Sequence, residues 1–134
     1  MAAIHAEWAG SRKPIVGLEA SDHGCTPTPE AGTLFAAPNQ INPESLNLDD
    51  TWTQPDKDFI ILATSGNNTP FVMLRHGKGM YLVTDMETHN AAEVAANAPM
   101  HENILHFIIQ WRKENLLPVE PRWKMATTWG KIKG

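Results

Sequence analysis

Three short apolar segments separated by turn residues constrain the fold more than any other feature. They predict strands at about 58–64, 71–76 and 80–84, because each is rich in β-branched, aromatic and large aliphatic residues. Gly77 and Gly79 supply the positive backbone angles that a short hairpin loop needs. The segments therefore predict a three-stranded antiparallel meander.

The first two strands are apolar at consecutive positions, over residues 59–63 and 71–74. Both faces of such a sheet need burial, which is unusual for an antiparallel sheet. Two helices, predicted at about 90–98 and 100–115, can cover one face. The N-terminal part of the chain is expected to wrap the other face, and a dimer through the sheet is the alternative.

Local signals set the ends of the two predicted helices. Asn90 and Glu93 resemble a capping box, and Pro99 fits the first turn of the second helix. The apolar side of that helix is predicted from helical spacing to hold Ile104, Leu105, Ile108, Ile109 and Trp111. His106, Gln110 and Lys113 fall on its polar side.

Six of the ten prolines lie in the first 55 residues, and prolines at that density break helices and confine strands to edges or short pieces. Residues 1–56 are therefore predicted to be largely irregular, with extra strands at 14–18 or 33–35. The chain reads as one α+β domain over 1–134, with its sheet-and-helix core at 57–117 and a tail at 118–134.

Composition excludes some classes of protein. The net charge is −4, whereas nucleic-acid-binding domains usually carry a marked basic excess. The single cysteine, Cys25, excludes an internal disulfide and fits a reducing compartment. The first ten residues have no basic start and no apolar core, and the longest apolar run covers only 59–63, too short for a membrane span. We expect a soluble cytoplasmic protein.

Charge is distributed unevenly along the chain. Residues 1–110 hold 5 Lys/Arg and 13 Asp/Glu, whereas residues 111–134 hold 6 and 2. The tail alternates basic and aromatic groups, and five tryptophans are many for this length. Tryptophan and arginine are typical of contact surfaces. The predicted binding residues are Arg122, Trp123, Lys124 and Trp129 in the tail, with Trp8 and Trp52 where these are exposed. For each tryptophan, burial in the core is the alternative.

Two motifs resemble chemical sites but fit simpler roles better. In 101–106, HENILH, His101 and His106 are five residues apart, or about 140° around a helix, so they cannot hold one zinc ion. Glu102 and His106 share a face and suit a surface hydrogen bond or ion pair. Residues 75–79, RHGKG, suit an anion-binding nest or, as we favour, a solvated hairpin loop.

A third motif, Asp22, His23 and Cys25, places a thiol near an imidazole, which is one way to activate a nucleophile. A lone intracellular cysteine is more often a small buried apolar residue. We favour that interpretation.

The remaining cluster is Asp85, Glu87 and His89, to which His76 and Tyr81 can add a pocket wall. Carboxylates beside imidazoles suit general acid–base chemistry. A helix cap by Asp85 or Thr88 explains the same turn more simply. His76, Asp85 and His89 remain the candidates for catalysis.

These residues do not complete a catalytic constellation, and no metal or cofactor is predicted. The leading hypothesis is a non-catalytic binding protein of the inhibitor or accessory type that contacts another protein. One alternative is a small-molecule-binding or hydrolytic protein with a His/Asp-lined pocket. The other is weak binding of single-stranded nucleic acid through the tail.

Overall fold

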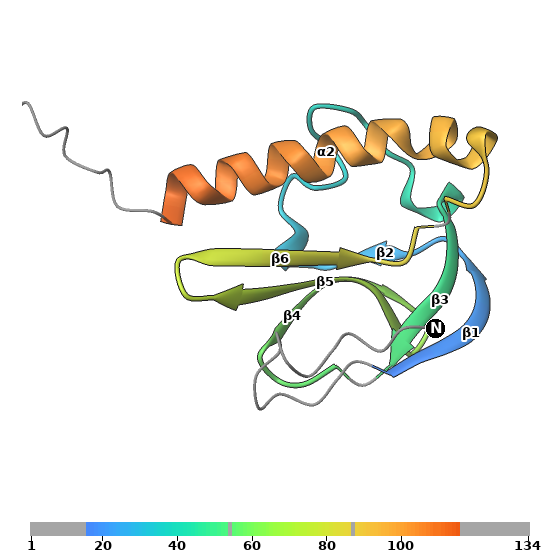
Figure 1. Ribbon diagram of the computed structural model, residues 1–134, viewed down its shortest axis with the longest axis horizontal. Coiled ribbons are helices and arrows are strands. Elements are labelled where there is room, and N and C mark those ends of the chain that lie inside the picture. The colour runs from blue at the N-terminus through green and yellow to red at the C-terminus, as the bar shows by residue number, and fades with distance from the viewer. Residues whose placement is uncertain (1–15, 54, 87, 116–134) are drawn as a thin grey trace, which may run out of the picture.

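The computed structural model describes residues 16–53, 55–86 and 88–115, with the backbone alone at 16–23 and 49–53. In this part of the chain, six strands form one antiparallel sheet and one long helix follows them (Figure 1). This is an α+β arrangement, as predicted. The strands are β1 (Val16–His23), β2 (Thr26–Pro27), β3 (Asn47–Thr53), β4 (Phe59–Ser65), β5 (Asn68–His76) and β6 (Gly79–Thr84). Two 3-10 turns, η1 (Pro29–Ala31) and η2 (Pro43–Ser45), precede β3, and the helix is α2 (Ala91–Asn115).

The strands β4, β5 and β6 pair in the order in which they occur in the chain. β5 lies between the other two, with Ile61 opposite Val72 and Met73 opposite Leu82. The last pair of the second hairpin is His76 with Gly79, which leaves a two-residue turn. Gly77 has a φ of 56° in that turn, as predicted, whereas Gly79 belongs to β6 and has no positive φ.

β5 begins at Asn68, three residues before the predicted start. Pro70 is tolerated there because the ladder is irregular between the Ala63–Phe71 and Ser65–Asn68 pairs. The Pro70 carbonyl still accepts a hydrogen bond from the Asp85 backbone N–H at 3.3 Å. The sequence pattern missed these positions because a proline normally argues against a strand.

The N-terminal part contributes β1, β2 and β3 to the sheet. β3 crosses the open end of the β5–β6 hairpin (Figure 1), where Thr53 pairs with Asn68. β1 overlaps the strand predicted at 14–18 from Val16 onward. The other proposed strand, 33–35, is a turn instead: Leu34 N–H bonds to the Ala31 carbonyl at 2.9 Å. Its apolar residues face the core from a turn, so their hydrophobicity is not evidence of a strand.

Both faces of the central strands are buried within a single chain. On the side of α2, Leu62, Phe71 and Met73 pack with Phe35, whose ring meets the Phe71 ring edge-on at 5.2 Å. On the other side, Phe59, Val72 and Leu74 form a second cluster, and Val72 and Leu74 are fully buried. No second copy is needed to cover those positions.

The two predicted helices are one helix, Ala91–Asn115, with Pro99 inside it. Proline removes one backbone hydrogen bond, at a cost of about 3 kcal/mol in a helix interior, but its own φ is helical. Asn97, Met100 and Asn103 are all buried on the side facing the sheet and the 34–41 segment. Burial on both sides of Pro99 keeps the helix continuous through the proline.

The outward face of α2 differs from the prediction. Leu105 and Ile109, assigned to the buried side, are 62% and 52% exposed. His106 and Gln110, assigned to the polar side, are half-buried and 3.3 Å apart between their Nε2 atoms. The buried side is instead centred on Met100, Asn103 and Phe107, about 180° away from Leu105 and Ile109 at 100° per residue.

Candidate binding surface

The histidine cluster predicted from the sequence does not assemble. His76 lies at the tip of the β5–β6 hairpin, and His89 lies beyond the other end of β6. Both are exposed, and five strand steps separate the two ends by about 17 Å. The ring of His76 lies 6.2 Å from that of Tyr81, and Asp85 is half-buried near Cys25. His76 and His89 therefore do not line one pocket.

The junction before α2 is a capping box, as the Asn90–Glu93 pattern predicts. Asn90 Oδ1 accepts hydrogen bonds from the N–H groups of Ala92 and Glu93, both at 3.0 Å. Glu93 Oε2 in turn accepts from the N–H groups of Asn90 at 3.2 Å and His89 at 2.7 Å. Asn90, rather than Asp85 or Thr88, is the cap, and the polar residues near it are explained by local structure.

The HENILH segment lies within α2 and has a structural role. The sequence predicts a contact between Glu102 and His106. In the structure, Glu102 Oε2 instead accepts a hydrogen bond from Asn39 Nδ2 at 2.8 Å. The third residue of the motif, Asn103, is fully buried and ties the helix to the loop beneath it. Asn103 Oδ1 accepts from Asn39 N–H at 2.8 Å, and Nδ2 donates to the carbonyls of Leu34 at 2.9 Å and Asn39 at 2.8 Å.

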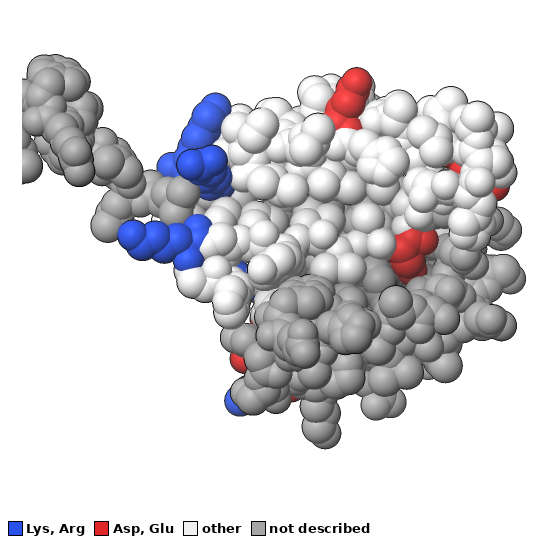
Figure 2. Space-filling view, viewed as in Figure 1, with Lys and Arg blue, Asp and Glu red and all other residues white. Residues whose placement is uncertain are grey.

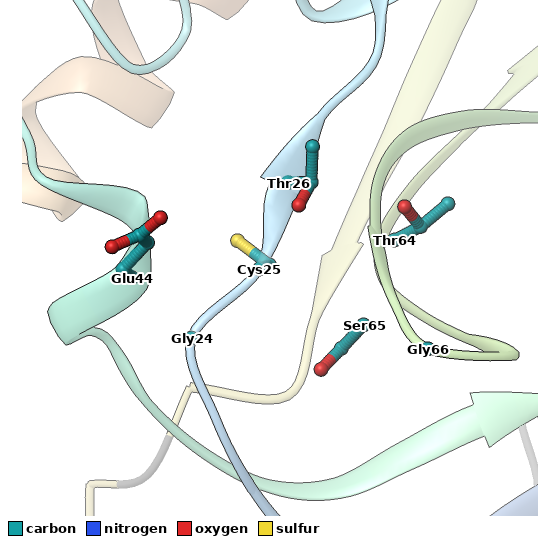
Figure 3. A pocket seen from close by; sticks show the side chains of 7 residues that line it. All are labelled: Gly24, Cys25, Thr26, Glu44, Thr64, Ser65 and Gly66. Carbon is teal, nitrogen blue, oxygen red and sulfur yellow. The ribbon is translucent and has the colours of Figure 1, made fainter.

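Cys25 lies in a small open hollow of about 220 Å³ between η2 and the end of β4. Glu44 stands on one side, and Thr64 and Ser65 stand on the other (Figure 3). Burial raises the pKa of Cys25 to about 12, and the Asp85 carboxylate adds to the rise. The thiol is therefore protonated at neutral pH and is a poor nucleophile. The side chains of Asp22 and His23, the other members of that motif, lie outside the described residues.

Basic side chains gather at one end of the molecule. Among the described residues, every Lys and Arg except Lys57 lies there: Arg75, Lys78, Arg112 and Lys113, all exposed. Figure 2 shows these groups together at the end where the hairpin tip and the C-terminus of α2 meet, while the acidic groups on this face are scattered. We call these four residues and Trp111 the basic end.

A hollow of about 240 Å³ lies within the basic end, lined by Arg75, Gly77, Lys78, Trp111 and Asn115. The Arg75 guanidinium carbon lies 5.8 Å from the centroid of the Trp111 ring, which is cation–π distance. Trp111 is half-buried, and the guanidinium of Arg75 lies over its ring. The hollow thus combines an aromatic surface with two cations from the hairpin.

Local structure explains why these groups converge. The two-residue turn at Gly77 brings Arg75 and Lys78 to the tip of the hairpin. α2 continues through Pro99, so its last turn reaches the same tip. Arg112 and Lys113 lie in that last turn, where positive side chains stabilise the helix by interacting with the negative, carbonyl end of its dipole. The RHGKG segment is a hairpin loop, as we favoured. Two further basic residues, Arg112 and Lys113, lie at the nearby end of α2.

The other predicted binding residues are not placed by the structure. Trp8, Arg122, Trp123, Lys124 and Trp129 lie outside the described residues, and Trp52 belongs to β3 without a described side chain. The chain continues from Asn115, at the basic end, into the predicted basic tail.

Comparison with protein-family models, with curated proteins and with solved structures finds no match to this chain. Among the described residues, no three His, Cys, Asp or Glu side chains are placed to hold a metal ion. No helix in 16–53, 55–86 or 88–115 is long and apolar enough to cross a membrane.

Sequence reasoning missed the proximity of Arg75 and Trp111. Each was noticed within its own segment, because the two are far apart in the sequence. Only the continuity of α2 and the pairing of β5 with β6 place them together. The sequence does show two cations at the hairpin and two at the end of the helix. It does not indicate that the two pairs lie close together in space.

Proposed function

We propose that the chain is a small cytoplasmic binding protein, of the inhibitor or accessory type, that docks an acidic segment of another protein on its basic end. The tail residues Arg122, Trp123, Lys124 and Trp129, predicted from the sequence, are proposed to bind the same partner. The observation that supports the proposal is the concentration of cations around Trp111 on a chain whose net charge is −4.

The chemistry of the basic end suits a peptide with carboxylates and apolar groups. The planar guanidinium of Arg75 can bind a carboxylate through two parallel hydrogen bonds. Lys78 offers a second, more flexible cation, and the hollow beside Trp111 accepts an apolar side chain. Stabilisation of the helix end accounts for Arg112 and Lys113, but not for two cations on the hairpin.

Single-stranded nucleic acid is the second candidate, because it also binds through cations and aromatic rings. The four clustered cations give a small electrostatic footprint beside an acidic body, which favours a protein partner. The alternative of a hydrolytic or small-molecule site receives no comparable support, since His76 and His89 lie apart.

The proposal is tested by fluorescence anisotropy with a labelled unstructured peptide rich in Asp and Glu, and in parallel with labelled oligothymidine. Arg75→Ala/Lys78→Ala should weaken peptide binding about tenfold or more, which corresponds to about 1.4 kcal/mol. The matched control is Lys57→Ala, which removes an exposed cation that belongs to neither the β5–β6 hairpin nor α2 and should leave affinity within about twofold.

The tail is tested separately with Trp123→Ala and Trp129→Ala, each expected to reduce binding by more than about 1 kcal/mol without unfolding the domain. Peptide binding that responds equally to Lys57→Ala, or that is absent at about 50 mM salt, would contradict the proposal. Tighter binding of oligothymidine than of the peptide would favour nucleic acid instead.

A further inference from the structure

Strand β6 has one side that the sheet does not use. Within the described part of the chain, β6 pairs with β5 alone, and no strand pairs with its other side. The two-residue turn at Gly77 closes on a hydrogen-bonded pair, and such pairs alternate along an antiparallel ladder. Tyr81 and Val83 therefore direct their backbone N–H and C=O groups toward β5. Met80 and Leu82 direct theirs away from it, so the outer side of β6 presents a row of backbone donors and acceptors.

The composition of β6 leaves this edge open to pairing. The strand reads GMYLVT, with no proline and no charged residue, and its ladder with β5 has no bulge. Proteins usually protect an exposed edge strand with lysine, proline or a bulge. Met80 and Leu82 are only half-buried, so the edge keeps contact with solvent. An unprotected edge of this kind can accept an added strand.

The helix α2 covers a face of β6 rather than this edge. Ile104, Phe107 and Trp111 of the helix pack against the core cluster that includes Met73 of β5. The helix is also tied to the loop beneath it by the hydrogen bonds of Asn103. Because α2 is held over β5 and this loop, it lies above the sheet. A strand can therefore be added beside β6 in the plane of the sheet, about 4.8 Å away.

Two cations of the basic end lie at the start of this edge. Lys78 directly precedes β6, and Arg75 is opposite Met80 in the pairing of β5 with β6. A carboxylate, that of Asp85, directly follows β6 at its other end. The edge therefore has opposite charges at its two ends. This arrangement favours an added strand whose own acidic residues lie beside the hairpin tip.

We infer that the acidic segment of the partner binds as an added strand along β6, with its acidic residues beside Arg75 and Lys78; this inference rests on the proposed function. Backbone hydrogen bonds to Met80 and Leu82 supply affinity that does not depend on the side chains of the segment. The two cations select the acidic residues at one end of it. A segment about as long as β6 spans about 20 Å.

The test measures amide hydrogen exchange of the full chain by NMR, alone and with an excess of a labelled peptide. The peptide alternates threonine and valine and ends in three glutamates, because antiparallel pairing, the more stable arrangement, brings its C-terminus to the hairpin tip. The amides of Met80 and Leu82 should exchange rapidly in the free chain and at least tenfold more slowly with the peptide. Tyr81 and Val83 are internal controls, since their N–H groups are bonded to β5 in both states.

A second peptide tests the backbone hydrogen bonds without changing the protein. Its sequence is the same, but every threonine and valine is N-methylated, so it keeps its charges and loses those backbone donors. In fluorescence anisotropy it should bind at least tenfold more weakly than the unmodified peptide. Arg75→Ala/Lys78→Ala should also weaken binding of the unmodified peptide tenfold or more, whereas the control Lys57→Ala should leave it within about twofold.

Slower exchange at Met80 and Leu82, together with weak binding of the N-methylated peptide, supports the inference. If Arg75→Ala/Lys78→Ala weakens binding but exchange at Met80 and Leu82 does not change, strand addition is overturned while the proposed function stands. If the unmodified peptide does not bind at about 50 mM salt, both fail. Slow exchange at Met80 and Leu82 in the free chain would mean that this chain or a second copy already covers the edge, and it would also overturn the inference.

Discussion

Removing the side chain of Asn103 should reduce the free energy of unfolding of this domain by a large fraction. The residue is fully buried, and its amide makes three hydrogen bonds to the backbone of the loop beneath α2. Asn103→Ala leaves an N–H and two carbonyls without those partners, and each buried unsatisfied group costs about 1–3 kcal/mol. Alanine recovers about 0.5 kcal/mol of helix propensity.

Two of the three hydrogen bonds are only part-buried, so the lower end of that range applies and the net loss is about 3–4 kcal/mol. A typical domain has a free energy of unfolding of about 5–15 kcal/mol. At about 3–5 °C per kcal/mol for a chain of this size, the melting temperature should fall by about 9–20 °C. Urea unfolding followed by circular dichroism gives the free energy directly.

Asn103→Leu separates hydrogen bonding from volume, because leucine fills a similar space without polar atoms. It should destabilise the protein about as much as alanine does. Asn115→Ala, on an exposed position of the same helix with one bond to the Trp111 carbonyl, should change stability by less than about 0.5 kcal/mol. A loss below about 1 kcal/mol in both Asn103 variants would refute the assignment of Asn103 as the tie between α2 and the loop.

Three further predictions concern the backbone and the thiol. Gly24→Ala should destabilise the protein severely in thermal melts, because φ is +83° and a Cβ would stand 2.6 Å from the Glu44 carbonyl oxygen. The control, Gly66→Ala, has φ +56° and open space around the new Cβ, so it should lower the free energy of unfolding by only about 1 kcal/mol. Pro99→Ala should stabilise the protein by about 1–2 kcal/mol in urea unfolding, because it restores a helix hydrogen bond; no gain would mean that the helix needs proline there. Cys25 should react with iodoacetamide at pH 8 far more slowly in the native state than in urea. Because folding raises its pKa from 9.0 to about 12, its contribution to stability is present below pH 9 and declines as pH rises from 9 towards 12; equal labelling rates would contradict its burial.

Local sequence signals were sufficient for the strands around Phe59–Ser65 and Gly79–Thr84 and for the cap at Asn90. In each case the evidence lies within a few residues of the element: an apolar run, a glycine turn or a side chain that bonds to the next turn. The start of β5 was missed because Pro70 is a local argument against a strand, and the irregular pairing that tolerates it is set by β4.

The helix shows where local rules fail. Pro99 is a sound signal for a helix start, and the sequence contains no stronger local signal against it. Burial of Asn97 and Met100 on the two sides of Pro99 overrides that preference. The basic end was missed for a related reason, since the meeting of Arg75 with Trp111 depends on the full length of α2.

The orientation of α2 also explains why its outward face is apolar. Asn103 must face inward to reach the loop carbonyls, and Leu105 and Ile109 follow it by about 200° and 240° around the helix. With Asn103 fixed, these two residues must face outward. A helix selected only to fill the core would place leucine at 103 and polar residues at 105 and 109. At 103 the polar side chain gains three hydrogen bonds to the loop, whereas the exposed leucine at 105 and isoleucine at 109 have no comparable gain within the fold.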